Sequence, residues 1–132
     1  MKIIFLILLI SSLVGCSKPN AWVKLTTSQD GGTTVYFNPS TGSRDGNVVR
    51  VMELSDYLIP RGGQRGVPRL SLEVQSEYDC DRFTFRYLSL YAHSGNMGTG
   101  EVVETDAIPS ARQALPKYSL GYRTAKEICR KL

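Results

Sequence analysis

The chain has 132 residues, a formal net charge of +4, 42% hydrophobic residues and 21% charged residues. This length supports one domain with one hydrophobic core and excludes a second domain of ordinary size. The mild positive charge suits acidic partners such as sulfated glycans or anionic lipid headgroups, although many solvated surfaces carry a similar charge.

The first residues have the layout of a secretory signal peptide. Lys2 supplies one positive charge, residues 3–10 are apolar, and small residues follow. The apolar run is too short to span a bilayer, which requires about 20 apolar residues. Leu13-Val14-Gly15-Cys16 then resembles the lipobox of bacterial lipoproteins, in which cleavage precedes the cysteine and a lipid is attached to its thiol. The alternative is an ordinary signal peptide in which Cys16 has no special role.

These features predict a cleaved signal peptide over residues 1–15, a lipidated tether over 16–20 and one domain over 21–132. Cleavage leaves 117 residues and lowers the formal charge to +3, because Lys2 is lost. Stable anchoring requires more than one acyl chain, which a triacylated Cys16 would provide. A serine rather than an aspartate follows the cysteine, which favours the outer membrane. Whether the domain faces the cell surface or the periplasm stays open.

Six β-strands are predicted in the domain. Turn-forming residues such as Asp30-Gly31-Gly32 separate segments that are rich in β-branched and aromatic residues. Apolar and polar positions alternate over residues 69–78, which predicts a strand with Ser71 and Glu77 on a solvent-facing side. Residues 107–117, which hold two prolines, are predicted to be irregular. The predicted strands are Trp22–Thr27, Thr33–Asn38, Val48–Tyr57, 69–78, Arg82–Tyr91 and Gly100–Thr105.

The last segment has a helical period instead. The apolar face of this helix comprises Ala125, Ile128, Cys129 and Leu132. The helix is predicted to begin near Ser119 or Tyr122. Short connections between successive strands favour an antiparallel meander, and the helix is the element available to cover its apolar face. The predicted fold class is therefore α+β, a six-stranded antiparallel meander sheet with a C-terminal helix packed on one face.

Two cysteines, Cys80 and Cys129, remain once Cys16 is assigned to the lipid. An exported protein folds in an oxidising compartment, where a remaining pair predicts a disulfide. Closing this long loop would stabilise the fold by about 4 kcal/mol and would tether the helix to the sheet. The alternative, a thiol nucleophile or metal ligand, has only one histidine in the chain, His93, as a partner.

The sequence contains no recognisable constellation for catalysis. His93, the only histidine, is predicted in an exposed loop beside the Ser94-Gly95-Asn96 turn and not as the base of a nucleophile–base pair. A zinc site would need a cluster of Cys and His. Asp79 and Asp81 are predicted to cap a turn rather than to act as a catalytic pair. We therefore predict a non-enzymatic protein with no cofactor, no metal and no nucleic acid partner.

Two basic clusters are the candidate binding residues. Arg61, Arg65 and Arg69 surround a glycine-rich loop predicted over Pro60–Pro68. Arginine can bind a sulfate or carboxylate group through two hydrogen bonds at once, so such a cluster would bind sulfated glycans or acidic protein segments. The alternative is a solvated loop and a helix end whose cations complement the helix dipole. The second cluster consists of Lys117, Arg123, Lys126, Arg130 and Lys131.

Several segments match one known family. The most specific is Glu77-Tyr78-Asp79-Cys80 in combination with Cys129 on the late helix. Met52 departs from the pattern, since the family often has tryptophan there. The other matching pieces are Trp22, Val35-Tyr36-Phe37-Asn38-Pro39, residues 47–57 and Gly98-Thr99-Gly100-Glu101-Val102-Val103. On these residues, nearly all of 21–132 resembles the surface-adhesin protein E family of bacterial lipoproteins.

The resemblance implies a six-stranded antiparallel sheet with a C-terminal helix tethered to its concave side by a disulfide. It also implies an adhesin for host matrix or plasma proteins, such as vitronectin, laminin and plasminogen. One alternative is a periplasm-facing envelope structural or assembly lipoprotein. Another is an enzyme or small-ligand carrier, which would need a closed polar pocket of which the sequence shows no sign. The unpaired edges of an open sheet would also allow a homodimer.

Overall fold

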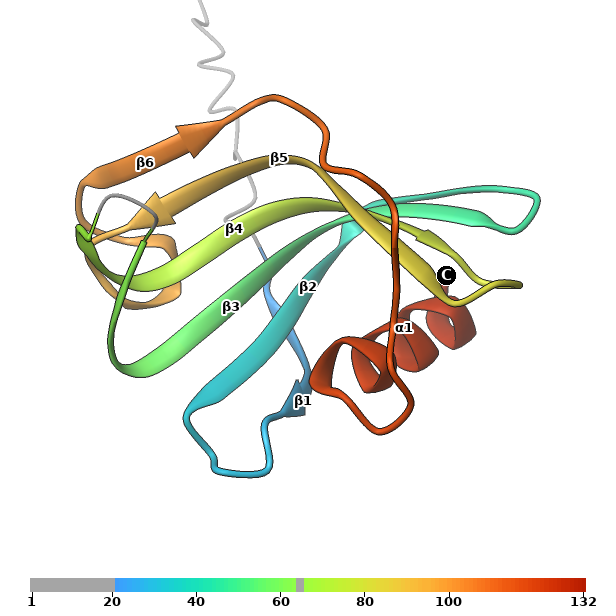
Figure 1. Cartoon of the computed structure of the whole chain (residues 1–132), viewed down its shortest axis with the longest axis horizontal. Helices are drawn as coiled ribbons and strands as arrows, with labels where there is room; N and C mark the ends of the chain where they lie inside the picture. The colour runs from blue at the N-terminus through green and yellow to red at the C-terminus, as the bar shows by residue number, and fades with distance from the viewer. Residues whose placement is uncertain (1–20, 64–65) are drawn as a thin grey trace, which may run out of the picture.

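The computed structural model describes residues 21–63 and 66–132, so the predictions for residues 1–20 and for Arg65 lie outside the described part. One antiparallel sheet and one C-terminal helix form the domain (Figure 1). A short 3-10 helix, η1, spans Asn96–Gly98, and the helix α1 spans Leu120–Lys131. The strands are β1 (Val23–Thr27), β2 (Thr33–Asp45), β3 (Val48–Gly62), β4 (Pro68–Asp79), β5 (Thr84–His93), β6 (Val102–Asp106) and β7 (Gln113–Ala114).

The sheet is a meander, as predicted. Strands β1 to β6 are neighbours in chain order, and every neighbouring pair is antiparallel. The short β7 pairs with Thr84 and Phe85 of β5, on the same edge that β6 occupies further along the strand. Residues 107–117 were predicted to be irregular, and β7 corrects this prediction. Two residues are too few to show an alternating pattern in the sequence.

Strands β2 and β3 extend beyond the predicted ends. The predicted strands ended at Asn38 and Tyr57, because a turn-rich segment follows Asn38 and the predicted glycine-rich loop begins at Pro60. The structure accommodates Pro39 and Pro60 at irregularities of the register, between Asn38 and Ser43 in β2 and between Asp56 and Arg61 in β3. The strands then continue, so that the β2–β3 hairpin is long and projects beyond the sheet at the right of Figure 1.

Helix α1 packs on one face of the sheet and begins where the sequence predicted. Ser119 is its N-cap, and the Ser119 Oγ accepts a hydrogen bond from the Tyr122 backbone N–H at 3.1 Å. The buried core between helix and sheet consists of Phe37, Val49, Val51, Tyr78, Ala125 and Ile128. The fold class predicted from the sequence is therefore confirmed.

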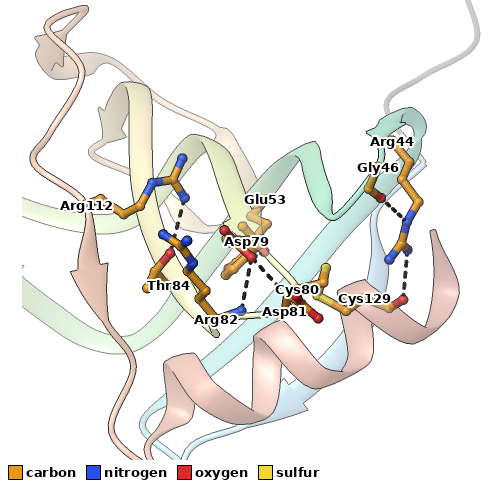
Figure 2. The surroundings of a disulfide bond; sticks show 11 residues. Arg44, Gly46, Glu53, Asp79, Cys80, Asp81, Arg82, Thr84, Arg112 and Cys129 are labelled. Atoms are coloured by element: carbon orange, nitrogen blue, oxygen red, sulfur yellow. Dashed lines mark hydrogen bonds between the residues drawn. A yellow bond between two sulfur atoms is a disulfide. The ribbon is translucent and has the colours of Figure 1, made fainter.

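The predicted disulfide is present and fixes the C-terminal half of α1. Cys80 follows β4 and is bonded to Cys129, with 5.7 Å between their Cα atoms (Figure 2). Arg44 of the β2–β3 hairpin donates a hydrogen bond to the Cys129 carbonyl oxygen at 3.1 Å. A cation at this position also suits the negative end of the helix dipole. Strand, hairpin and helix are thus joined at one corner of the domain.

The opposite face of the sheet is partly covered by the loop that contains η1. Ser71 is fully buried there, although the alternation predicted a solvent-facing side chain. Its hydroxyl donates to the Gly95 carbonyl at 2.6 Å and accepts from the Gly98 N–H at 2.9 Å. His93, predicted in an exposed loop, is the last residue of β5 and is only 8% exposed. The alternation of polar and apolar residues along a strand does not reveal that a loop folds back and buries the polar face.

Candidate binding site

The first predicted basic cluster is only partly assembled. Arg61 and Arg69 are cross-strand partners in β3 and β4. The Arg61 guanidinium lies 5.0 Å from the ring centroid of Tyr57, and the Arg69 Nη1 lies 3.3 Å from the Glu104 Oε2. Both arginines therefore already contact groups of this chain, which reduces their capacity to bind a partner.

The second predicted cluster forms a separate surface. Lys126, Arg130 and Lys131 are exposed on α1, and Arg130 pairs with Glu127 at 2.7 Å. The C-terminal end of β3 and the N-terminal end of β4 lie at the other end of the sheet from α1, at the left of Figure 1. The two predicted clusters therefore do not combine into one site. The cations of α1 match the alternative interpretation of a solvated helix end.

A third cluster, which the sequence did not reveal, surrounds Glu77. The register places Arg50 of β3 and Arg86 of β5 directly beside Glu77 of β4. The Arg50 Nε lies 2.7 Å from the Glu77 Oε2, and the Arg86 Nε lies 2.8 Å from the Glu77 Oε1. Arg112, from the connection before β7, also donates to the Glu77 Oε1. We call these four residues the arginine cluster.

The arginine cluster corrects the predicted exposure of Glu77. This residue was predicted on the solvent-facing side of its strand, but it is only 1% exposed because three guanidinium groups cover it. Burial by itself acts to raise the pKa of Glu77, and the hydrogen bonds and charges of Arg86 and Arg50 outweigh this effect. The pKa is lowered to about 2, so the carboxylate stays ionised at neutral pH.

The cluster carries more positive charge than Glu77 neutralises. Three guanidinium groups surround one carboxylate, and the side chains of Arg50, Arg86 and Arg112 are 53%, 34% and 35% exposed. A hollow of about 230 Å³ lies next to it, lined by Arg50, Glu77, Arg86, Ser43, Asp45 and Val48. The outer donors of these guanidiniums can reach an acidic group from solvent. The arrangement can therefore bind an anion, and it contains no nucleophile–base pair.

The turn beside the cluster has the predicted form. The Asp79 carboxylate accepts hydrogen bonds from the backbone N–H groups of Asp81 and Arg82, both at 3.0 Å (Figure 2). These bonds, together with the nearby arginines, lower the pKa of Asp79 although slight desolvation opposes them. Asp79 thus caps the turn, as predicted, whereas Asp81 contributes its backbone N–H and not its carboxylate. Figure 2 also shows Arg112 donating to Thr84, which fixes the third guanidinium over this end of the sheet.

The described residues show no grouping of metal ligands and no membrane-spanning helix. Within 21–63 and 66–132, no three His, Cys, Asp or Glu side chains are grouped so as to hold a metal ion. Of the helices in this part of the chain, none combines the length and the apolar character needed to cross a membrane.

Comparison with known proteins identifies the family. The family description "Surface-adhesin protein E" matches residues 22–130. The chain belongs to the surface-adhesin protein E family. Its predicted membership is thus confirmed, and the family supports an adhesin-like, non-enzymatic role at the bacterial cell surface. A search of curated protein sequences returned no match.

One solved structure of protein E has a similar fold. The selenomethionine form of Haemophilus influenzae protein E has a TM-score of 0.58 and 11% identity, covering 85% of this chain and 91% of that chain. Protein E from non-typeable Haemophilus influenzae has a TM-score of 0.48 and 14% identity, covering 85% and 86%. At such low identity the first match is a likeness of fold alone.

Proposed function

We propose that this protein is a lipid-anchored binding module of the bacterial envelope that attaches to host matrix or plasma proteins. Its family supports the adhesin-like role, and the lipobox at Cys16 supports the anchor. Lipid on this cysteine would hold residues 21–132 at the outer membrane through a short tether. Each buried acyl CH₂ contributes about 0.8 kcal/mol, so several chains give a stable anchor.

The observation that carries the proposal is the excess charge of the arginine cluster. Arg50 and Arg86 each donate a single N–H to Glu77, which leaves their other donors for a ligand. Arginine binds carboxylates and sulfates bidentately. Because Glu77 and the sheet already hold the guanidiniums in place, little side-chain entropy is lost on binding. An acidic or sulfated segment of the host protein is therefore the partner chemistry that we assign to this surface.

The binding surface is tested by a matched pair of variants. Arg50→Met removes the most exposed guanidinium of the cluster, and Arg130→Met removes the same charge from α1. Binding to immobilised laminin and vitronectin is measured by surface plasmon resonance. We expect Arg50→Met to weaken binding roughly tenfold, and Arg130→Met by less than about twofold. Equal losses would show that only net charge matters and would overturn the assignment of this surface.

The anchor and its orientation are tested in cells. Cys16→Ser is expected to abolish labelling by a radioactive fatty acid, and undiminished labelling would contradict the anchor. Protease added to intact cells is expected to remove the domain, with the fragments identified by mass spectrometry. Complete protection would contradict host binding and would favour the periplasm-facing structural or assembly lipoprotein. The homodimer stays a prediction, which light scattering of the purified protein would check.

A further inference from the structure

A cavity lies between the sheet and the N-terminal end of α1. Its volume is about 230 Å³, and it is open to solvent on one side. Its walls are mainly apolar and include Val35, Leu72, Val74, Phe85, Leu115 and Leu120. The cavity differs from the closed polar pocket that an enzyme or carrier was expected to need. It is on the helix-covered face, opposite the arginine cluster, because Tyr78 lines it and the adjacent Glu77 points the other way.

One carboxylate lies among these apolar walls. Glu53 of β3 lines the cavity and is only 7% exposed. It accepts hydrogen bonds from the Tyr78 hydroxyl at 2.7 Å and from the Ser76 hydroxyl at 2.9 Å. No salt bridge to Glu53 occurs in the described part of the chain. Its two partners are therefore neutral donors, and each carboxylate oxygen retains a lone pair for a further donor.

We propose that this cavity binds a small organic ammonium ion, with the apolar body against the cavity walls and the ammonium group on Glu53. A buried carboxylate without a cation is costly, and a bound ammonium would supply the missing charge. The apolar walls would bury the body of the same ligand. The site is independent of the binding function proposed above, since it uses other residues on the other face.

The ionisation of Glu53 sets the pH range of this binding. Burial raises the pKa of Glu53 to about 7, and the hydrogen bonds from Tyr78 and Ser76 only partly oppose the rise. Glu53 and Tyr78 are the titratable groups that line the cavity, and burial raises the pKa of Tyr78 further above its ordinary value of 10. As the pH falls through about 7 the carboxyl takes up a proton and loses the charge that would pair with a cation. Binding therefore strengthens as the pH rises through 7.

The cavity volume limits the size of the ligand. A cavity of about 150 Å³ holds benzene, so about 230 Å³ has room for roughly nine non-hydrogen atoms. 2-Phenylethylammonium has this size and stays cationic at pH 8. Two probes of similar size, neutral 2-phenylethanol and anionic phenylacetate, separate the contribution of charge from that of shape.

The test is an NMR titration of the exported protein carrying Cys16→Ser. At pH 8 we expect the ammonium probe to shift the amide signals of Val35, Leu72 and Thr124. At pH 8 we expect 2-phenylethanol to bind roughly tenfold more weakly than the ammonium probe, and phenylacetate not to bind. The affinity of the ammonium probe is expected to fall roughly tenfold when the pH is lowered from 8 to 5.5. Equal affinity for alcohol and ammonium, or no binding of the ammonium at pH 8, would overturn the proposal.

Two variants connect the binding to Glu53. Glu53→Gln keeps the size of the side chain and is expected to remove the preference for ammonium while binding of the alcohol persists. Ser55→Leu keeps the carboxylate and narrows the cavity, so it should weaken both probes. Dispersed amide signals check that each variant is folded. If Glu53→Gln is folded and still prefers the ammonium, the assigned ion pair is wrong.

Discussion

Two buried glutamates occupy opposite faces of the same sheet and have opposite electrostatic surroundings. Glu77 is 1% exposed and is held by three arginines, and its pKa is lowered to about 2. Glu53 is 7% exposed and is held by two hydroxyl groups, and its pKa is raised to about 7. Little of either side chain is exposed, but Glu77 is covered by guanidiniums that are themselves one-third to one-half exposed, whereas Glu53 lies beside the cavity between sheet and helix. Depth and partners together therefore decide whether each carboxylate is ionised.

The difference also separates two possible uses of a buried charge. Glu77 fixes three guanidiniums in a rigid surface that retains excess positive charge for a macromolecular partner. Glu53 lacks a cation and lies beside an empty apolar volume, so its charge is available to a small ligand. One sheet thus offers an anion-binding surface on one face and a cation-binding cavity on the other. Each variant below perturbs one face more than the other.

The largest effect is expected from removing the disulfide. This bond holds α1 on the face of the sheet that carries Glu53, and not on the face that carries Glu77. Cys80→Ala combined with Cys129→Ala should lower the free energy of unfolding by about 4 kcal/mol. As α1 loosens, water should reach Glu53, and its pKa should fall towards 4.5, while the pKa of Glu77 stays near 2. Urea unfolding and carbon-detected NMR titration measure these quantities. An unchanged Glu53 pKa would mean that α1 does not maintain its burial.

Glu77→Gln should have the next largest effect and should act on the other face. Three guanidiniums would lose their counter-charge, and breaking a buried ion pair from one side costs about 3 kcal/mol. Thermal unfolding at pH 7 measures the loss. The exposed Glu101 offers a control, since Glu101→Gln removes the same charge and should change stability by less than about 0.5 kcal/mol. Similar losses for the two variants would show that net charge, and not the cluster, is responsible.

Glu53→Gln should have an effect of opposite sign. The folded-state pKa of about 7 exceeds the ordinary value of 4.5, so the folded state binds more protons between these pH values. Stability therefore falls as the pH rises from 4.5 to 7, and the neutral amide avoids this loss. We expect the variant to be more stable than the wild type by about 3 kcal/mol at pH 8, with no gain at pH 4. A loss at both pH values would contradict the unfavourable ionisation of Glu53.

The sequence predicted the sheet and helix because their signals are local. Glycine-rich turns separated the strands, and the helical spacing of Ala125, Ile128 and Cys129 indicated α1. Of the two predicted starts, Ser119 and Tyr122, the structure has Ser119 as the N-cap. The disulfide was predicted from the number of cysteines in a chain that is predicted to be exported. The ends of β2 and β3 were predicted too early, because each strand continues past a register irregularity that depends on its neighbouring strand.

Both buried glutamates were missed because their partners are distant in the sequence. Arg50 and Arg112 lie 27 and 35 residues from Glu77, so only the strand register and the course of the 107–117 connection bring them together. A further irregularity between Gln75 and Ser76 of β4 sets which residue of β5 faces Glu77. For Glu53 a signal existed, since it follows the buried Val49 and Val51 at alternate positions. That alternation places a carboxylate on the apolar face.

The smallest effect is expected from Arg112→Met, which removes one arginine of the cluster and leaves the other two in place. Glu77 would keep Arg50 and Arg86, and Arg112 is about one-third exposed, so the loss at pH 7 should be about 1 kcal/mol. The depressed pKa of Glu77 contributes stability above pH 4.5 that is lost as the pH falls towards 2. With one arginine fewer this pKa should rise, so variant and wild type should differ at pH 7 and converge near pH 2. Urea unfolding from pH 2 to pH 7 measures the difference in free energy of unfolding between variant and wild type. If this difference is the same at every pH, Arg112 stabilises the fold by packing and not through the charge of Glu77.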